Sequence, residues 1–365
     1  MKRKVCCFLE SWDFGGIEAL ITDILTAENV SDLKIDVIAA RISKNAYSDR
    51  LEKIGVRFIE LTGRLRSLEN FPRFASILKA EGYDAIHFNI FHGVALNYVR
   101  IAKKLGVKTR IIHAHGAGLR KSATKPLKML LHNFCKLIFK NIGTDYLACS
   151  HNAAKFLHGN TPASIVNNGI RTEAFRFCPP IREAMREALG IQDELLAGHV
   201  GRLSSEKNQA FVLEVFKGYH SINPASHLVF LGDGPMKDEY ESYAETLGIS
   251  SSVSFLGIQN NTSEWLSAMD FFIFPSVVEG LGIAAIEAQA SGLYALCSES
   301  LPPEAAVSDR FIPLPITSTE IWVNKMLELP LPSNRELYAD TVKGSGFDIS
   351  DTVCKILALY RGEKL

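Results

Sequence analysis

Two carboxylates, Glu279 and Glu287, flank a short glycine-containing segment with seven residues between them. The segment follows the apolar run Phe271–Phe274, which predicts a buried parallel strand, and Ile283–Ala290 predicts a helix that begins after Gly282. A helix start presents free N–H groups and a positive dipole end, and glycine lets an anion approach the backbone closely. We therefore expect a phosphate here, with the carboxylates beside the hydroxyl groups of whatever carries it. The alternative is an ordinary strand-to-helix turn with solvated glutamates.

Two cations, Arg202 and Lys207, lie in the stretch Gly201-Arg-Leu-Ser-Ser-Glu-Lys-Asn208. This stretch follows the predicted strand Leu196–Gly201 and precedes the predicted helix Gln209–Tyr219. Open α/β sheets bind ligands where their strands end, so the two cations could neutralise a diphosphate, arginine through its planar fork and lysine as a point charge. No Asp-x-Asp pair occurs in the chain, so the usual carboxylate ligands of a nucleotide-bound metal ion are missing and we expect no metal. We expect no organic cofactor either. A solvated loop with an ordinary salt bridge is the alternative.

Two further glycine-containing loops follow predicted strands in the same half of the chain. They are Gly232-Asp-Gly-Pro235, which contributes Gly232 and Gly234, and Gly257-Ile-Gln-Asn260. Because the carboxyl ends of parallel strands share one edge of a sheet, these loops are expected beside the two cations and the two glutamates. The combination predicts a rim that binds phosphate and hydroxyl groups.

The composition is that of a soluble globular protein. The 365 residues are 47% hydrophobic and 22% charged, which argues against disorder and suffices for two ordinary domains. No apolar run approaches the ~20 residues that span a bilayer, and the apolar run near the N-terminus is too short for a signal peptide. Seven scattered cysteines without a Cys-x-x-Cys pair fit a reducing cytoplasm and give a zinc site little support.

The zero net charge conceals two oppositely charged halves. Residues 1–170 contain 25 Lys and Arg against 14 Asp and Glu, a balance of +11, and residues 171–365 contain 15 against 26, a balance of −11. This asymmetry predicts that the first half meets an anionic surface or ligand.

Strand-like runs alternate with helical patterns along the whole chain, which predicts an α/β fold with two doubly wound parallel sheets. A polar stretch from Ile165 to Pro180 interrupts the alternation, and the segment Ile349–Tyr360 predicts a final amphipathic helix. The expected domains are residues 1–170 and 171–348. The predicted strands are Val5–Leu9, Ile35–Ala40, Arg57–Glu60, Ala85–Phe88, Thr109–His113, Tyr146–Cys149, Leu196–Gly201, His227–Leu231, Val253–Leu256, Phe271–Phe274 and Leu293–Cys297.

Residues 195–305 resemble the nucleotide-sugar domain of the retaining glycosyltransferases with the GT-B fold, glycosyltransferase family 4. The motifs at 201–208, 232–235 and 279–287 stand in that family's order and spacing. The resemblance implies two Rossmann-like domains that face a cleft, with the last helix, 349–362, returning to the first. It also implies the roles of the site residues: Arg202 and Lys207 hold the donor diphosphate, Glu287 holds the ribose, Glu279 contacts the transferred sugar, and the amides at Gly282 and Ile283 meet the distal phosphate.

In the first half, Gly15-Gly16-Ile-Glu18 resembles the family's glycine loop after the first strand, and Arg110–His115 resembles its histidine-bearing strand end. We expect His115 to touch the reacting sugar or the acceptor, with His113 as the second candidate. A structural role is the alternative for either histidine.

The resemblance is closest to members that build bacterial capsule and exopolysaccharide, through Cys149-Ser-His-Asn152 and Val166-Asn-Asn-Gly169. It implies transfer of a sugar, without a metal and with retention of configuration, from a UDP-sugar held by the second domain. The acceptor is expected to be a free or lipid-linked glycan on the side of the first domain, with no nucleic acid involved. Departures from common family usage at Leu281 and Tyr294 concern sugar selectivity and local packing.

Two other functions fit parts of the sequence. Gly280-Leu-Gly-Ile-Ala-Ala285, with Glu299 after the next strand, also matches a nicotinamide-binding fingerprint. That alternative gives no role to Arg202, Lys207 or Glu279. A non-catalytic scaffold of the same fold is the second alternative, although every candidate catalytic position is filled.

In residues 120–140, six basic residues recur at steps of three to four beside an apolar side, and the stretch contains no acidic residue. Pro126 favours a helix start. The recurring basic residues are Lys121, Lys125, Lys128, His132, Lys136 and Lys140, and the apolar ones are Leu127, Leu130, Leu131, Phe134, Leu137 and Ile138. One interpretation is a helix packed on its own domain with its lysines in water. The other is a basic face that holds a cytoplasmic enzyme at an anionic membrane surface.

Overall fold

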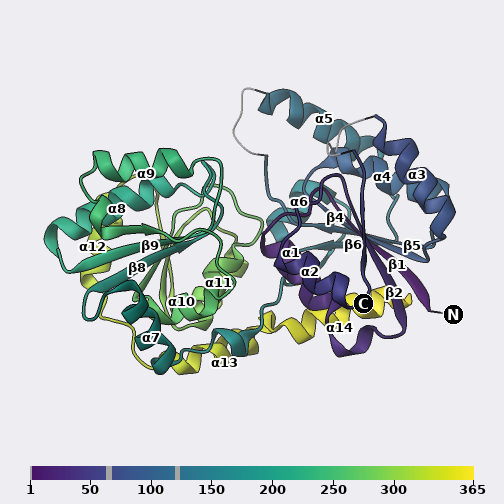
Figure 1. Ribbon diagram of the computed structural model, residues 1–365. Coiled ribbons are helices and arrows are strands. Elements are labelled where there is room, and N and C mark those ends of the chain that lie inside the picture. The colour runs from purple at the N-terminus through teal and green to yellow at the C-terminus, as the bar shows by residue number, and fades with distance from the viewer. Residues whose placement is uncertain (1, 63–67, 120–123) are drawn as a thin grey trace. The chain divides into compact units, whose positions relative to one another are not determined.

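The computed structural model describes residues 2–62, 68–119 and 124–365, which form two compact units (Figure 1). Unit 1 comprises Met1–Gly169 and Ile349–Leu365, and unit 2 comprises Ile170–Asp348. Each unit is a parallel sheet covered by helices, so the prediction of two Rossmann-like domains is confirmed. Among the described helices, none combines the length and the apolar character needed to cross a membrane.

The sheet of unit 1 has seven parallel strands in the order β3-β2-β1-β4-β5-β6-β7. The strands are β1 Arg3–Leu9, β2 Leu33–Ala39, β3 Arg57–Glu60, β4 Ala85–Ile90, β5 Thr109–Ala114, β6 Asp145–Ala148 and β7 Ser164–Ile165. The α-helices are α1 Gly16–Leu25, α2 Ala46–Lys53, α3 Asn70–Glu81, α4 Leu96–Lys104, α5 Lys125–Ile138, α6 His151–His158 and α14 Ile349–Arg361. All six strands predicted for this half are present. The two-residue β7 was not predicted, because it is too short to show a pattern.

The sheet of unit 2 has six parallel strands in the order β10-β9-β8-β11-β12-β13. The strands are β8 Leu195–Val200, β9 Ser226–Leu231, β10 Val253–Phe255, β11 Phe271–Phe274, β12 Tyr294–Ser298 and β13 Phe311–Leu314. The α-helices are α7 Pro179–Leu189, α8 Gln209–Ile222, α9 Lys237–Thr246, α10 Thr262–Ala268, α11 Ile283–Ala290, α12 Thr319–Glu328 and α13 Tyr338–Val342. Five of these strands were predicted. The sixth, β13, contains Pro313 and was missed because proline is tolerated only at a sheet edge, which is where this strand lies.

The central strands are buried on both faces, which explains their uninterrupted apolar runs. Every residue of Val5–Leu9 in β1 and of Phe271–Phe274 in β11 is buried, because helices cover both sides of a parallel sheet. The chain order reverses between β1 and β4 in unit 1 and between β8 and β11 in unit 2. Loops that follow strands on the two sides of such a switch point diverge and leave room for a ligand.

Helix α5 begins at Lys125, one residue before Pro126, as predicted, but its apolar side does not pack on unit 1. Its buried residues are His132 and Cys135, whereas the six apolar side chains expected to face inward are exposed. Helix α5 therefore packs on its own domain, as one interpretation held, but through His132 and Cys135 and not through its apolar side chains. Lys121 lies outside the described residues.

The final helix, α14, belongs to unit 1 and closes a buried polar network there. The hydroxyl of Tyr360 lies 3.2 Å from Sγ of Cys7 in β1 and 2.9 Å from Nδ1 of His87 in β4. Nε2 of His87 lies 3.2 Å from Nδ1 of His113 in β5. All four side chains are at most 1% exposed, so the network is shielded from water.

Burial lowers the pKa of His87 to about 3 and holds the pKa of His113 well below its usual value. His115, which follows β5, is 5% exposed, and burial lowers its pKa to about 3 as well. A charged imidazole would lose its hydration in these positions, so all three rings are neutral near pH 7.

Replacing Tyr360 by Phe removes one hydroxyl from the network and leaves Nδ1 of His87 without a partner. We expect Tyr360→Phe to lower the free energy of unfolding by about 1–3 kcal/mol, measured by urea denaturation. The double variant with His87→Phe should lose less free energy of unfolding than the two single variants lose in sum, because it removes both polar partners. Fully additive losses would show that the two groups do not interact.

The three buried histidines also make stability depend on pH. In the unfolded chain their imidazoles bind protons near pH 6.5, whereas in the native state they stay neutral down to much lower pH. The unfolded state therefore binds more protons below about pH 6.5, and the free energy of unfolding should fall as pH falls. Urea denaturation between pH 7.5 and 5 should show a slope of up to about 1.4 kcal/mol per pH unit for each histidine. A flat profile would contradict the neutral, buried assignment.

Candidate functional site

Lys207 and Glu279 meet at the switch point of unit 2. Lys207 lies in the loop after β8, and Glu279 lies in the loop after the neighbouring strand β11. Nζ of Lys207 is 2.5 Å from Oε1 of Glu279, and the two side chains are 22% and 12% exposed. A cation and an anion predicted separately from distant motifs thus form one partly buried ion pair.

Further contacts hold the two loops together. The backbone N–H of Val277 donates to the carbonyl of Glu206 at 2.9 Å, and Nδ2 of Asn208 donates to the carbonyl of Pro275 at 3.4 Å. The Lys207 ammonium also lies over the ring of Phe274, 5.1 Å from its centroid. These contacts fix the backbone from which the ion pair extends.

His199 and Gln209 position the loop that carries Arg202. Nδ1 of His199, in β8, donates to the carbonyl of Ile273 in β11 at 2.8 Å, so Nε2 is left to accept from Nε2 of Gln209 at 3.2 Å. Gln209 also donates to the carbonyl of Arg202 at 2.8 Å and accepts from the N–H of Ser204 at 3.3 Å. Burial lowers the pKa of His199 to about 4, which keeps its ring neutral in this arrangement.

The glycines of the 232–235 loop have a steric role that the sequence did not reveal. A Cβ on Gly232 would lie 2.1 Å from the carbonyl oxygen of Gly201, and one on Gly234 would lie 2.2 Å from that of Leu203. The N–H of Leu203 donates to the carbonyl of Asp233 at 3.1 Å. The loop after β9 therefore packs directly on the loop after β8, and only glycine fits at the two contacts.

Helix α11 begins at Ile283, as predicted, and directs its N-terminus to the carboxyl edge of β11. Gly282 precedes it with φ of 91°, a left-handed conformation that favours glycine, and no side chain caps the helix. Glu287 lies in the second turn and is partly buried. An uncapped helix start beside a cation can bind a phosphate.

Arg202, in the loop next to Lys207, has an exposed side chain. The structure thus brings Arg202, Lys207, Glu279 and the α11 N-terminus to loops that follow two adjacent strands. This arrangement can exchange the carboxylate partner of Lys207 for a phosphate oxygen, and it leaves the carboxylate free to accept from a hydroxyl.

In unit 1, the predicted glycine loop follows β1, whereas His113 lies within β5 and His115 directly follows that strand. Gly15 is the N-cap of α1 and has no side-chain cap, and a Cβ there would lie 2.8 Å from Oε2 of Glu18. Gly16 is the first residue of that helix. Nε2 of His115 lies 3.0 Å from Oδ1 of Asn89, and its Nδ1 is buried without a hydrogen-bond partner among the described residues.

His113 belongs to the buried network with His87, whereas His115 lies one residue beyond the strand. The ring centroids of His113 and His115 are 4.0 Å apart, so both imidazoles occupy one buried cluster at the carboxyl end of β5.

A polar contact at the switch point of unit 1 was missed in the sequence. Oε1 of Glu10, directly after β1, accepts from the N–H of Phe91 at 2.9 Å and lies 3.2 Å from Nδ1 of His92, two residues after β4. Both residues follow predicted strands, so knowing that β1 and β4 are neighbours would have predicted the contact between Glu10 and His92.

Comparison with known proteins covers both units. Residues 14–174 match the family model for Glycosyltransferase Family 4, and residues 181–325 match that for Glycosyl transferases group 1. Each match covers most of one unit.

Similar proteins extend over most of the chain. The putative glycosyltransferase EpsF of Bacillus subtilis is 26% identical over 98% of this chain and 96% of its own length. The UDP-Gal:alpha-D-GlcNAc-diphosphoundecaprenol alpha-1,3-galactosyltransferase of Escherichia coli is 26% identical over 81% of this chain and 80% of its own. The structure of Anabaena HepE in complex with UDP-glucose has a TM-score of 0.77 at 19% identity, covering 98% of this chain and 99% of that one. The two parallel sheets and the two family matches together show that the chain belongs to the group 1, family 4 glycosyltransferases with the GT-B fold.

Proposed function

We propose that unit 2 holds a nucleotide diphosphate sugar at the switch point between β8 and β11. The observation that carries the proposal is the ion pair between Lys207 and Glu279, whose Nζ and Oε1 atoms are 2.5 Å apart at the carboxyl edge of the sheet. A diphosphate would take Lys207 from its carboxylate partner. Arg202, on the same loop, and the amides at Gly282 and Ile283 would supply the other donors.

In this proposal the acceptor hydroxyl attacks the anomeric carbon of the sugar while the bond from that carbon to the phosphate oxygen breaks. The departing phosphate oxygen takes the proton of the hydroxyl, and the acceptor attacks the face from which the diphosphate leaves, so configuration is retained. Stabilising the negative charge of the leaving group supplies most of the catalysis. Arg202 and Lys207 provide that stabilisation without a metal, and Glu279 contacts the transferred sugar.

We infer that the donor is a UDP-sugar and that the product enters a bacterial surface polysaccharide, such as a capsule or an exopolysaccharide. The E. coli relative is named for transfer from UDP-Gal to a diphosphoundecaprenol-linked sugar, and the HepE structure contains UDP-glucose. A Staphylococcus aureus relative is named for capsular polysaccharide biosynthesis. These names support a glycan acceptor, free or lipid-linked. With such an acceptor we place the enzyme in the cytoplasm, at the inner membrane face.

Unit 1 is proposed to receive the acceptor, with Gly15, Gly16 and His115 at the edge that meets it. His115 is neutral, because burial lowers its pKa to about 3, and Asn89 accepts from its Nε2–H. Its Nδ1 is therefore a hydrogen-bond acceptor, suited to a sugar hydroxyl.

Substitutions of the ion pair separate binding from transfer. Lys207→Ala should weaken UDP binding by about 10- to 100-fold and slow transfer, because it removes a charged hydrogen bond worth roughly 1.5–3 kcal/mol. Glu279→Gln should abolish most transfer while UDP binds at least as tightly, since the substitution releases Lys207 for the phosphate. Isothermal titration with UDP and an assay of UDP release measure the two effects.

The matched control is the ion pair of Lys325 with Glu328 on α12, which is also 2.5 Å long but is exposed. Lys325→Ala and Glu328→Gln should leave UDP affinity and turnover unchanged. Full activity in Glu279→Gln would remove that residue from the site.

A panel of nucleotide sugars tests the reaction itself. We expect UDP release from one or more UDP-sugars, at the same rate with Mg²⁺ and with EDTA, and an α-linked product from an α-linked donor by NMR. Release that requires a divalent ion, or an inverted product, would contradict the proposed mechanism. The absence of release from every donor, with UDP bound, would favour a non-catalytic scaffold.

A further inference from the structure

Helix α5 of unit 1 exposes its apolar side chains to solvent and buries a polar one, His132, which is the reverse of an ordinary surface helix. Six apolar side chains, between 39% and 68% exposed, follow one another along its outer side, and we name them the apolar row. The apolar row consists of Leu127, Leu130, Leu131, Phe134, Leu137 and Ile138. A monomeric soluble protein rarely exposes so continuous an apolar surface without a partner for it.

Polar contacts attach the other side of α5 to unit 1. His132 is 1% exposed, its Nδ1 accepts from the N–H of Gly93 at 2.9 Å, and its Nε2 donates to the carbonyl of Phe156 at 3.0 Å. Nζ of Lys136 donates to the same carbonyl. A Cβ on Gly93 would lie 2.5 Å from the carbonyl oxygen of His132, so the helix approaches the backbone closely. The attachment of α5 therefore does not use the apolar row.

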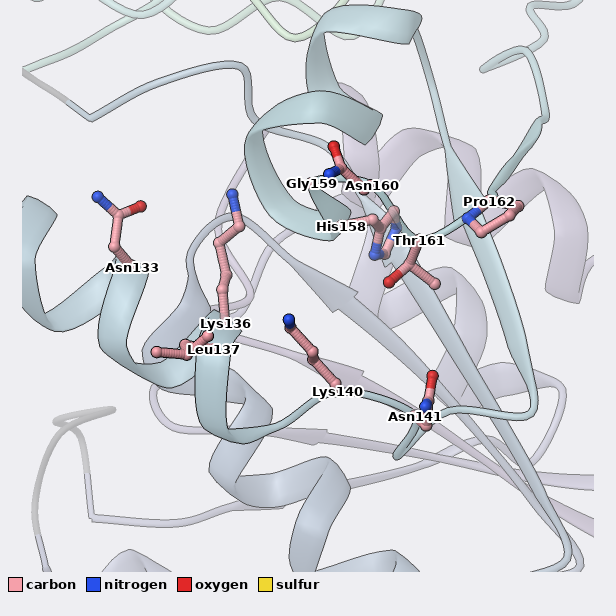
Figure 2. Close-up of a pocket in the computed structure, with 10 residues that line it drawn as sticks. All are labelled: Asn133, Lys136, Leu137, Lys140, Asn141, His158, Gly159, Asn160, Thr161 and Pro162. Carbon is pink, nitrogen blue, oxygen red and sulfur yellow. The ribbon is translucent and has the colours of Figure 1, made fainter.

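A pocket of about 470 Å³ borders the apolar row at the C-terminal end of α5 (Figure 2). Its lining comes from the end of α5 and from the segment after α6, and Leu137 belongs to both the pocket and the row. Lys136 and Lys140 carry ammonium groups into this region, and none of the ten lining residues is acidic. Asn133 and Asn160 add side-chain amides. The pocket thus offers cations and N–H donors, which suit a phosphate.

The charge around α5 indicates whether a second copy of this chain or a lipid bilayer covers the apolar row. No acidic residue occurs between Asp84 and Asp145, a stretch that contains eleven lysines and arginines. A second copy of this chain would bring the same positive margin against the first, and like charges oppose that contact. An anionic bilayer offers acyl chains to the row and phosphates to the margin and the pocket.

We propose that α5 lies in the surface of an anionic phospholipid bilayer, with the apolar row among the acyl chains and a lipid phosphate in the pocket of Lys136 and Lys140. The inference extends the proposed function, on which it rests for the presence of a lipid-linked acceptor. Binding of this kind differs from attraction through lysines alone, because insertion of the apolar row contributes more binding free energy than the charges do.

Fluorescence of Phe134→Trp tests insertion. The three native tryptophans, Trp12, Trp265 and Trp322, are at most 7% exposed, whereas Phe134 is 57% exposed. Vesicles of phosphatidylglycerol and phosphatidylcholine should shift the emission of Phe134→Trp to the blue, and brominated acyl chains should quench it. Ile222→Trp, at a 62% exposed position of α8 in unit 2, is the matched control and should show neither effect. Equal responses of the two variants, or no response of either, would overturn the proposal.

Cosedimentation with vesicles measures separately how much the apolar row and the pocket contribute to binding. Leu130→Gln combined with Phe134→Gln should lower binding to anionic vesicles about tenfold or more. Lys140→Gln should lower it about fivefold, and it should leave the weak binding to phosphatidylcholine unchanged. Ile222→Gln should bind as the wild type does. If Lys140→Gln alone abolished binding, the membrane contact would rest on charge and not on the apolar row. If millimolar inorganic phosphate competed with the vesicles, the pocket would be a site for free phosphate instead.

The vesicle experiments use neither donor nor acceptor, so their outcome is independent of the transferase assay. Transfer to a soluble acceptor with no vesicle binding would refute the inference and leave the proposed function intact. Sedimentation without lipid completes the test: a dimer that Leu130→Gln dissociates would assign the apolar row to a second copy of the chain.

Discussion

The ion pair of Lys207 with Glu279 determines which ligands can bind between the loops after β8 and β11. It joins the loops of two strands on either side of a switch point, and both side chains are mostly buried. A charge so placed is costly to leave alone, because it has lost much of its hydration and needs a partner. Any ligand that separates the pair must therefore bring an anion for Lys207 and a donor for Glu279.

A sugar joined to a diphosphate carries both groups in one molecule. The phosphate can replace the carboxylate at Lys207, and a sugar hydroxyl can donate to the released Glu279. UDP alone satisfies only the first exchange. The pair thus gives a physical reason for the site to respond differently to the proposed donor and to the nucleotide that the proposed reaction would release.

In each sheet, buried imidazoles add side-chain contacts between neighbouring strands that the backbone ladder already pairs. His199 connects β8 with β11 in unit 2, and His87 and His113 connect β4 with β5 in unit 1. Burial keeps these rings neutral, so each can both donate and accept. In unit 1 the last helix completes the network through Tyr360, which makes α14 part of that core.

Much of the fold could be predicted because buried parallel strands are continuous apolar runs, and β11 and α11 begin and end where the sequence indicates. The edge strand β13 could not, since Pro313 masks its pattern. The Lys207–Glu279 contact joins residues 72 positions apart and follows from strand order, which local patterns do not give. The orientation of α5 was missed for a similar reason: periodicity identifies two faces of a helix but not which one is buried.

The most direct test is a crystal structure of this protein with a bound UDP-sugar. We expect Nζ of Lys207 to leave Glu279 and to lie within hydrogen-bond distance of a phosphate oxygen, with Glu279 beside the sugar and the diphosphate at the N-terminus of α11. A donor bound elsewhere, or one bound with the Lys207–Glu279 pair still closed, would contradict this expectation.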